Sequence, residues 1–283
     1  MTDILGLHHV SILAGAPAAN VAFYTRTLGL RLVKQTVNFD APSAWHLYYG
    51  DRVGSPGSLV TFFPEASDRP SEVGTGEVGA THLAIPRGTL DAWAKRLPDS
   101  EREGERLAFQ DHDGTRMTLE EIDAPGDGIV GLRAVTIVVA ALEPTARFLV
   151  DTLGLRAIDE RSFAIADGQP AIVELIAAPD APPARQGWGS VHHVALRVAD
   201  DAAQQRVRDR FIAAGLHPTE PRDRNYFRSV YVREPGGTIV EIATDGPGFA
   251  VDESVGSLGT KLMLPPQFEP NRAAIESRLP PLA

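Results

Sequence analysis

The sequence predicts an α+β fold made of four copies of one unit: a strand, a helix and then about three strands. Three observations support this prediction. The triplet His-His-Val opens an alternating apolar run at residues 8–10 and again at residues 192–194. The tetrapeptide Thr-Leu-Gly-Leu occurs at residues 27–30 and at residues 152–155. Each copy also ends in a turn followed by an apolar strand, so the order of elements recurs along the chain.

The first and fourth copies are the clearest. In the first copy, a helical segment at residues 20–30 follows the opening strand, and the copy closes with a strand that ends at residue 64. In the fourth copy, the helical segment covers residues 204–216 and the final strand covers residues 233–243. The apolar alternation predicts strands with one buried face. The glycine near the end of each helical segment suits a helix C-terminus.

The second and third copies are weaker. Their opening strands begin near residues 79 and 131, and their final strands near residues 113 and 167. Segments rich in proline, glycine and charge separate the copies. We therefore expect four modules and a C-terminal tail that packs on them, with the boundaries 1–66, 78–124, 129–178, 189–245 and 246–283.

The composition limits the class of protein. The chain has 283 residues, of which 43% are hydrophobic and 23% charged, as in soluble globular proteins. A net charge of -10 argues against nucleic acid and anionic membrane surfaces as partners. There is no cysteine, so disulfides and thiolate ligands are excluded. The sequence has no apolar run of bilayer length and no leader pattern, which predicts a cytoplasmic protein.

Strand alternation selects residues that face a cleft. In the first copy, Val10 and Ile12 suit the core, which leaves His9 and Ser11 on the opposite face. In the fourth copy, the same alternation turns His193 to the cleft. We expect His8 and His192, the first histidines of the two pairs, at the margin of this site.

The final strand of the fourth copy supplies a carboxylate. Glu241 stands in a strongly apolar run, where a glutamate is rarely buried unless it is paired or binds a metal. The matching residue of the first copy is Thr61, which is a poor ligand for a transition metal. His9, His193 and Glu241 therefore predict a divalent metal site with open coordination positions, as in non-haem iron(II) oxygenases.

The middle copies test this interpretation. We match the four positions to His82, Thr118, Ala134 and Glu174. One histidine has become alanine, so this second cleft is predicted to hold no metal. The pattern implies that copies one and four pair with each other, and that copies two and three form the other half.

Four segments resemble a known family across essentially the whole chain: LHHVSI (7–12), WHLYYGDRVGSPGSLVTFFP (45–64), VHHVAL (191–196) and the tail at 258–282. They resemble the vicinal oxygen chelate superfamily of glyoxalases, bleomycin-resistance proteins and extradiol dioxygenases. Within it, the chain looks like the dichlorohydroquinone and methylhydroquinone ring-cleaving dioxygenases. The resemblance implies βαβββ modules paired into two open-barrel halves. It also implies iron(II) as the metal, with manganese(II) as the alternative.

The resemblance further implies catalytic residues around the metal: His8, Ser11, His192, Arg224 and Tyr231. Ser11 is a departure, because the family carries threonine there. We expect His192 to transfer protons near neutral pH, Arg224 to face the anionic ring and Tyr231 to bond the distal hydroxyl. Further pocket-lining candidates are Trp45, His46 and Tyr48.

The predicted function is a non-haem iron(II) dioxygenase that inserts O2 into a hydroquinone ring, and a homodimer or higher homo-oligomer is expected. Three alternatives stay open. A glyoxalase-like isomerase would need a second glutamate where Thr61 stands. A catechol extradiol dioxygenase would place its metal in the last two copies, where Ala134 cannot bind it. The third alternative is a metal-free small-molecule binding protein.

Overall fold

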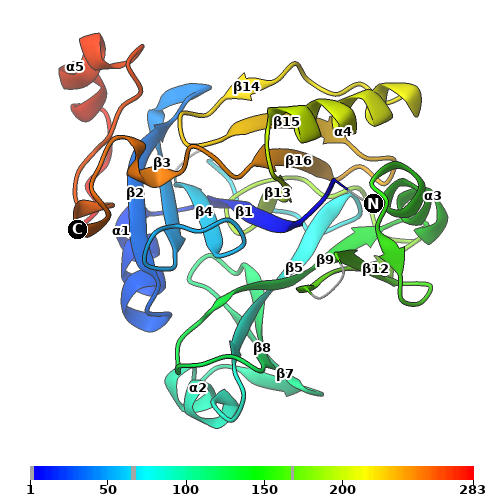
Figure 1. Cartoon of the computed structure of the whole chain (residues 1–283). Coiled ribbons are helices and arrows are strands. Elements are labelled where there is room, and N and C mark those ends of the chain that lie inside the picture. The colour runs from blue at the N-terminus through cyan, green and yellow to red at the C-terminus, as the bar shows by residue number, and fades with distance from the viewer. Residues whose placement is uncertain (1–2, 65–67, 167–168) are drawn as a thin grey trace.

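The computed structural model describes residues 3–64, 68–166 and 169–283, which form two eight-stranded sheets (Figure 1). Both ends of the predicted module 1 and the start of the predicted final strand of module 3 fall outside these residues. No helix in the described ranges is long and apolar enough to cross a membrane. The α+β fold class is confirmed.

Modules 1 and 4 each contain a strand, a helix and three further strands. Module 1 contains β1 (Gly6–Ala14), α1 (Pro17–Ala22), the π-helical turn η1 (Phe23–Thr27), β2 (Arg31–Asn38), β3 (Ala41–Gly50) and β4 (Leu59–Pro64). Module 4 contains β13 (Val191–Val198), α4 (Asp201–Ala213), β14 (Arg222–Asp223), β15 (Arg228–Arg233) and β16 (Ile239–Thr244).

Modules 2 and 3 repeat the same order. Module 2 contains β5 (Glu77–Pro86), α2 (Leu90–Arg96), β6 (Glu101–Glu103), β7 (Arg106–Gln110) and β8 (Arg116–Ile122). Module 3 contains β9 (Gly131–Val139), α3 (Leu142–Arg147), the π-helical turn η2 (Phe148–Thr152), β10 (Arg156–Ala157), β11 (Ser162–Ala166) and β12 (Gln169–Ala177).

The strand order shows how the modules pair. One sheet has the order β14-β15-β16-β13-β1-β4-β3-β2, so modules 4 and 1 meet at the antiparallel pair of β13 and β1. The other has the order β10-β11-β12-β9-β5-β8-β7-β6 and joins modules 3 and 2 in the same way. The predicted pairing is therefore confirmed. We call the first pair of modules the outer half and the second pair the inner half.

Each strand of the β1–β13 pair contains a β-bulge. The pairing skips His8 in β1 and His192 in β13, while the residues on either side stay paired. Such an extra residue bends the strand and redirects side chains, and it is common beside functional sites. Each bulged histidine contacts the histidine that follows it.

Glycines end the helical segments as the sequence predicts. Gly29, Gly154 and Gly215 have φ angles of 73°, 75° and 75°. These left-handed conformations favour glycine, because it lacks a Cβ atom. At the opposite end of α4, the carboxylate of Asp200 caps the helix by accepting from the backbone N–H of Ala203.

The apolar strand faces and the helices form a continuous core. Val10 and Ile12 of β1 and Val194 of β13 belong to it, as the alternation predicts. A smaller cluster, which includes Tyr48 and Phe227, lies on the other face of the outer sheet. This second cluster borders the cleft described below.

The C-terminal tail runs beside β2 and β3, at the upper left of Figure 1. It contains η3 (Phe249–Val251), η4 (Val255–Ser257), η5 (Glu269–Asn271) and α5 (Arg272–Glu276). Lys34 of β2 is fully buried, and its Nζ atom lies 2.6 Å from Asp252 and 2.5 Å from Glu253. Trp45 donates from Nε1 to the carbonyl of Pro280 at 2.8 Å. These contacts attach the tail to module 1.

Candidate metal centre

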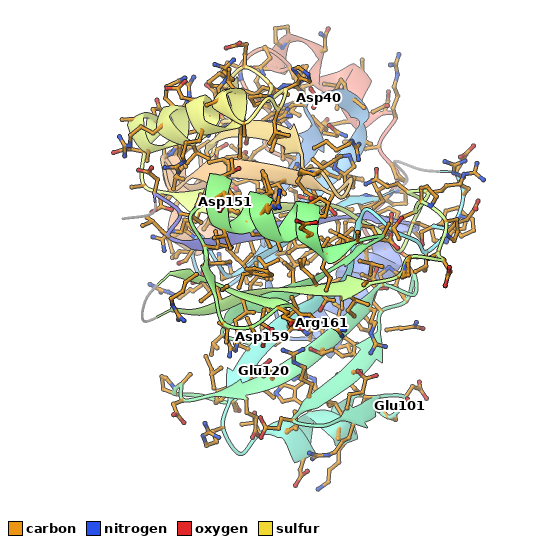
Figure 2. All side chains as sticks on the ribbon, turned by 90° about the vertical axis from the view of Figure 1, so that its right-hand side faces the viewer. Asp40, Glu101, Glu120, Asp151, Asp159 and Arg161 are labelled. Atoms are coloured by element: carbon orange, nitrogen blue, oxygen red, sulfur yellow. The ribbon has the colours of Figure 1, made fainter. Side chains whose placement is uncertain are left out.

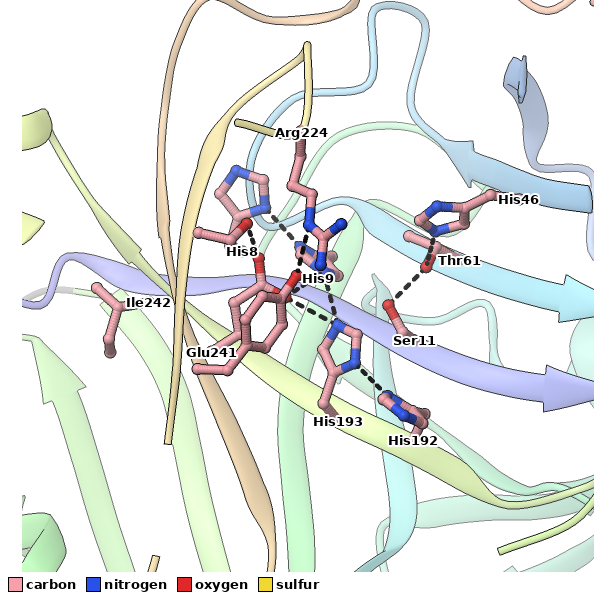
Figure 3. A network of polar contacts seen from close by, with 12 residues as sticks. His8, His9, Ser11, His46, Thr61, His192, His193, Arg224, Glu241 and Ile242 are labelled. Carbon is pink, nitrogen blue, oxygen red and sulfur yellow. Dashed lines mark hydrogen bonds and ion pairs between the residues drawn. The ribbon is translucent and has the colours of Figure 1, made fainter. Parts of the chain in front are cut away.

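Three strands of the outer half bring two imidazoles and one carboxylate together (Figure 3). The Nε2 atoms of His9 and His193 are 3.2 Å apart. The Oε2 atom of Glu241 lies 2.9 Å from Nε2 of His193 and 3.3 Å from Nε2 of His9. All three side chains are buried.

The spacing of these atoms suits one metal ion. Ligands at ~2.1 Å from a metal are ~3.0 Å apart at right angles and ~3.4 Å apart in a tetrahedron. The observed separations run from 2.9 to 3.3 Å. Oε2 of Glu241 is buried and makes no hydrogen bond of ordinary geometry within the described part of the chain. A divalent cation would satisfy this oxygen.

Strand register explains why these residues meet. His9 pairs with Ala195 across β1 and β13, and Ala195 pairs with Glu241 across β13 and β16. The three residues therefore form a row across the sheet, with a small alanine between the two ligands. His193 lies two residues before Ala195 and so projects from the same face.

Each candidate histidine ligand contacts its bulged neighbour. The Nδ1 atoms of His8 and His9 are 2.8 Å apart, and those of His192 and His193 are 2.7 Å apart. An imidazole that binds a metal through Nε2 carries its proton on Nδ1 and donates it. His8 and His192 must then accept at Nδ1 and carry their own protons on Nε2.

The two bulged histidines differ in their surroundings. His8 is 1% exposed and does not line the pocket, whereas His192 does. Burial, reinforced by the adjacent histidine, lowers the pKa of each to about 3. A pKa this low argues against the expected titration of His192 near neutral pH. In this tautomer, His192 is a neutral donor toward the pocket.

Ser229 of β15 holds the second oxygen of Glu241 and was missed from the sequence. Its hydroxyl donates to Oε1, and the side chain is fully buried. Burial would raise the pKa of Glu241, but His9 and His193 hold that pKa well below its ordinary value. The sequence did contain a signal for this residue, because Ser229 and Tyr231 alternate with buried valines and so share one strand face.

Arg224 and Tyr231 lie in the pocket wall. Figure 3 shows Arg224 above the candidate ligands. Arg224 donates from Nε to the Tyr231 hydroxyl at 3.2 Å, and the Tyr231 ring lies 5.6 Å from that of His193. Burial, with the charge of Glu241 second, raises the pKa of Tyr231 above its usual range. The tyrosine therefore stays protonated at neutral pH.

Ser11 and Thr61 belong to a hydrogen-bonded chain on the opposite side. Their hydroxyl oxygens are 2.7 Å apart, and Thr61 Oγ1 lies 3.1 Å from Nε2 of His46. Nδ1 of His46 is 2.9 Å from the Tyr48 hydroxyl. His46 and Tyr48 line the pocket, whereas Trp45 faces the core instead.

The pocket above the three donors has a volume of about 380 Å³. Phe39, Phe63 and Phe227 contribute aromatic walls that the sequence analysis did not identify. The ring of Phe227 lies 5.2 Å from that of His9. A small aromatic molecule would be held between apolar walls with polar groups at the metal end.

The inner half corrects one sequence match. Ala80, Thr136 and Glu174 form the row that corresponds to His9, Ala195 and Glu241. His82 pairs with Thr118, as Ser11 pairs with Thr61. His82 therefore corresponds to Ser11, and the match of His82 with His9 is wrong by two residues. A shift of two keeps the same strand face, so alternation could not reveal it.

The inner cleft contains a different polar network. His82 lies 2.6 Å from Thr118 Oγ1 and 2.7 Å from Thr136 Oγ1. Arg106 donates to both oxygens of Glu174 and also to Glu120, which is labelled in the lower half of Figure 2. Within the described ranges, three or more side chains that could bind one metal ion come together in the outer half.

Comparisons with known proteins agree with this architecture. The family model described as the Glyoxalase/Bleomycin resistance protein/Dioxygenase superfamily matches residues 6–119 and 131–242. The chain belongs to this superfamily. Glyoxalase I from Zea mays, at 16% identity and a TM-score of 0.64 over 85% of this chain and 92% of that one, shares the fold.

Several relatives match along almost their whole length. A Bacillus subtilis protein described as a ring-cleaving dioxygenase, MhqO, is 38% identical over 98% of this chain and 96% of its own. The chlorohydroquinone/hydroquinone 1,2-dioxygenase of Sphingobium indicum is 31% identical over 93% and 92%. A crystal structure described as a Bacillus subtilis dioxygenase has a TM-score of 0.94 and 37% identity over 100% and 99%. The resemblance to ring-cleaving dioxygenases is confirmed.

Proposed function

We propose that this protein is an iron(II)-dependent dioxygenase that opens the ring of hydroquinones between a hydroxylated carbon and its neighbour. The observation that carries the proposal is the buried group of His9, His193 and Glu241 at the base of an aromatic pocket. The relatives named above support a ring-cleaving reaction. Two of them, at 38% and 31% identity, cover over nine-tenths of the chain.

Iron(II) fits the donor set better than softer metals. Two imidazoles and one carboxylate leave open positions, which is the donor arrangement of non-haem iron(II) oxygenases. Manganese(II) is the alternative metal. When bound, the metal supplies a path for electrons from the electron-rich ring to O2, and both oxygen atoms enter the product.

The chain's own residues would bind and orient the substrate. Phe63 and Phe227 offer apolar contacts to the ring and exclude water. Arg224 offers a permanent positive charge to the anionic ring, and the Tyr231 hydroxyl lies within its reach. The Nε2–H of His192 can donate a hydrogen bond to an oxygen that develops negative charge.

Thr61 argues against the glyoxalase-like alternative. That chemistry needs a second carboxylate at this position, and here the threonine hydroxyl is bonded to Ser11 and His46. The expected homo-oligomer and cytoplasmic location stay predictions. Analytical ultracentrifugation would check the first and fractionation of cells the second.

Oxygen consumption tests the proposal. The protein is reconstituted with iron(II) without air and then mixed with O2 and either hydroquinone, chlorohydroquinone, catechol or methylglyoxal–glutathione. We expect one O2 consumed for each molecule of hydroquinone or chlorohydroquinone. Little O2 should be consumed with catechol or with methylglyoxal–glutathione. No O2 consumption with any aromatic diol would overturn the proposed function. Preference for catechol would replace it with the extradiol alternative.

A further inference from the structure

Ion pairs join the two edges of the outer sheet over the pocket. Asp40 lies on the turn between β2 and β3, and Arg222 and Arg224 lie on or just after β14. β2 and β14 are the opposite edge strands of this sheet, and Figure 1 shows them at its two ends. Oδ2 of Asp40 accepts from Arg224 at 2.9 Å, and Oδ1 lies 3.5 Å from Arg222.

Arg224 is therefore shared between a pocket residue and the mouth of the pocket. Its side chain is 14% exposed, and it bonds Tyr231 through Nε and Asp40 through Nη2. Burial would raise the pKa of Asp40, but the hydrogen bond and charge of Arg224 lower it. Asp40 is thus anionic at neutral pH and neutralises the guanidinium that the proposed substrate would meet.

The charges that line the pocket leave room for one negative charge on the substrate. Asp40 and Arg224 cancel each other, and Glu241 removes one charge from a divalent metal. A substrate bound as a monophenolate then makes the site neutral. The side chains of Arg222 and Asp40 are 47% and 60% exposed, so solvent screens both charges, whereas the Arg224 side chain is 14% exposed. A carboxylate on the ring would meet no unpaired cation inside the pocket, and it would face Asp40.

We propose that Asp40 is a specificity-determining residue that excludes hydroquinones with a second anionic group. By pairing with Arg224, it makes the pocket prefer rings substituted with hydrogen, halogen or alkyl groups over carboxylated rings. This inference rests on the proposed function, because it concerns which hydroquinones enter the same site. It assigns a role to the turn between β2 and β3, which contributes no candidate metal ligand.

The binding of two probe molecules tests the proposal. Dissociation constants of methylhydroquinone and 2,5-dihydroxybenzoate are measured by calorimetry without O2, on iron-loaded wild-type protein and on Asp40→Asn. The wild type should prefer methylhydroquinone. In Asp40→Asn, the freed guanidinium can bind the carboxylate, so the affinity for 2,5-dihydroxybenzoate relative to methylhydroquinone should rise roughly 10- to 100-fold.

Two further variants serve as controls. Asp40→Glu keeps the carboxylate and should keep the wild-type preference. Asp123→Asn makes the same change in net charge at an exposed pair, where Asp123 lies 2.7 Å from Arg87 in module 2. It should leave the ratio of affinities unchanged.

The outcomes separate this inference from the proposed function. An unchanged ratio of the two affinities in Asp40→Asn, or an equal rise of that ratio in Asp123→Asn, would overturn the role of Asp40. The proposed function would still stand if the wild type consumed O2 with hydroquinone. A wild type that binds 2,5-dihydroxybenzoate as tightly as methylhydroquinone would also overturn it. A wild type that binds neither molecule would overturn both proposals.

Discussion

The outer and inner halves of this protein have one architecture and two different centres. Each half pairs two βαβββ modules through an antiparallel strand pair. In the outer half, the row across the sheet is His9, Ala195 and Glu241, whereas in the inner half it is Ala80, Thr136 and Glu174. The fold therefore provides positions, and the residues at those positions decide whether a metal can bind.

In the inner half, an arginine supplies the positive charge next to the carboxylate that corresponds to Glu241. Ala80 and Ala134 stand where the outer half has His9 and His193. Glu174 is held by both terminal nitrogens of Arg106, so a fixed guanidinium supplies the positive charge. A guanidinium can thus neutralise a carboxylate at this position where the two histidine ligands are absent.

The largest expected difference concerns the two glutamates. Glu241→Ala removes a candidate ligand and should weaken metal retention more than roughly 100-fold, because even the loss of an outer partner of a ligand costs 10- to 100-fold. Glu174→Ala should leave metal retention intact. Metal content after dialysis, measured by mass spectrometry, gives the comparison. Equal losses in both variants would contradict the assignment of the metal to the outer half.

Acid should destabilise the metal-free protein through its buried histidines. The pKa is lowered to about 3 in His8 and His192 of the outer half and to about 4 in His82 of the inner half, in each case first by burial. Below the ordinary pKa of 6.5, the unfolded chain binds protons that the folded chain does not. The stability that these histidines contribute is therefore fully present above pH 6.5. It falls as the pH decreases toward the pKa values of the folded protein.

Each of these histidines should contribute about 1 kcal/mol per pH unit to that fall. Urea unfolding of the metal-free protein at pH 7, 6 and 5 measures it. His82→Gln should reduce the slope of unfolding free energy against pH by the contribution of one histidine. A free energy of unfolding that is constant between pH 7 and pH 5 would show that these imidazoles are not buried in the neutral form.

A matched pair of hydroxyl variants sharpens the comparison. Ser229 donates to Glu241 in the outer half, and Thr136 donates to Glu174 at 3.1 Å in the inner half. Ser229→Ala should weaken metal affinity roughly 10- to 100-fold, since it frees the carboxylate to turn. Thr136→Val should not change it. Competition with a chelator measures both, and similar affinities in Ser229→Ala and wild type would exclude the orienting role.

The smallest expected effect is at Arg106. Arg106→Met leaves the half-buried Glu174 without its cation, while Glu120 keeps its ion pair with Arg133. The loss should cost about 1–2 kcal/mol in the free energy of unfolding. Metal retention should stay at the wild-type level, because the outer half is untouched. Denaturant unfolding and metal analysis of the same preparation test the two statements together. A loss of metal here would mean that the inner cleft contributes to binding.

Much of the fold could be predicted from the sequence because its signals are local. Alternation identified strand faces, and glycines such as Gly29 identified helix ends. The candidate ligands His9, His193 and Glu241 could be chosen because each is a polar residue in an apolar strand. The structure brings these three together.

What could not be predicted depends on contacts between distant segments. Ser229 and Phe227 look like ordinary strand and loop residues until strand register is known. Asp40 is a turn residue whose partners belong to the opposite sheet edge. The error at His82 arose because strands shifted by two residues have the same alternation. Register is fixed by tertiary packing, which a single sequence does not display.

The nested pairing of modules has a consequence for the order in which the protein is made. Modules 2 and 3 are neighbours in the chain, whereas the first strand of the outer half must wait for β13 and β16. A growing chain can therefore complete the inner half while His9 still lacks both companions, which stand at positions 193 and 241. Capture of a metal by all three residues becomes feasible only when synthesis is nearly finished.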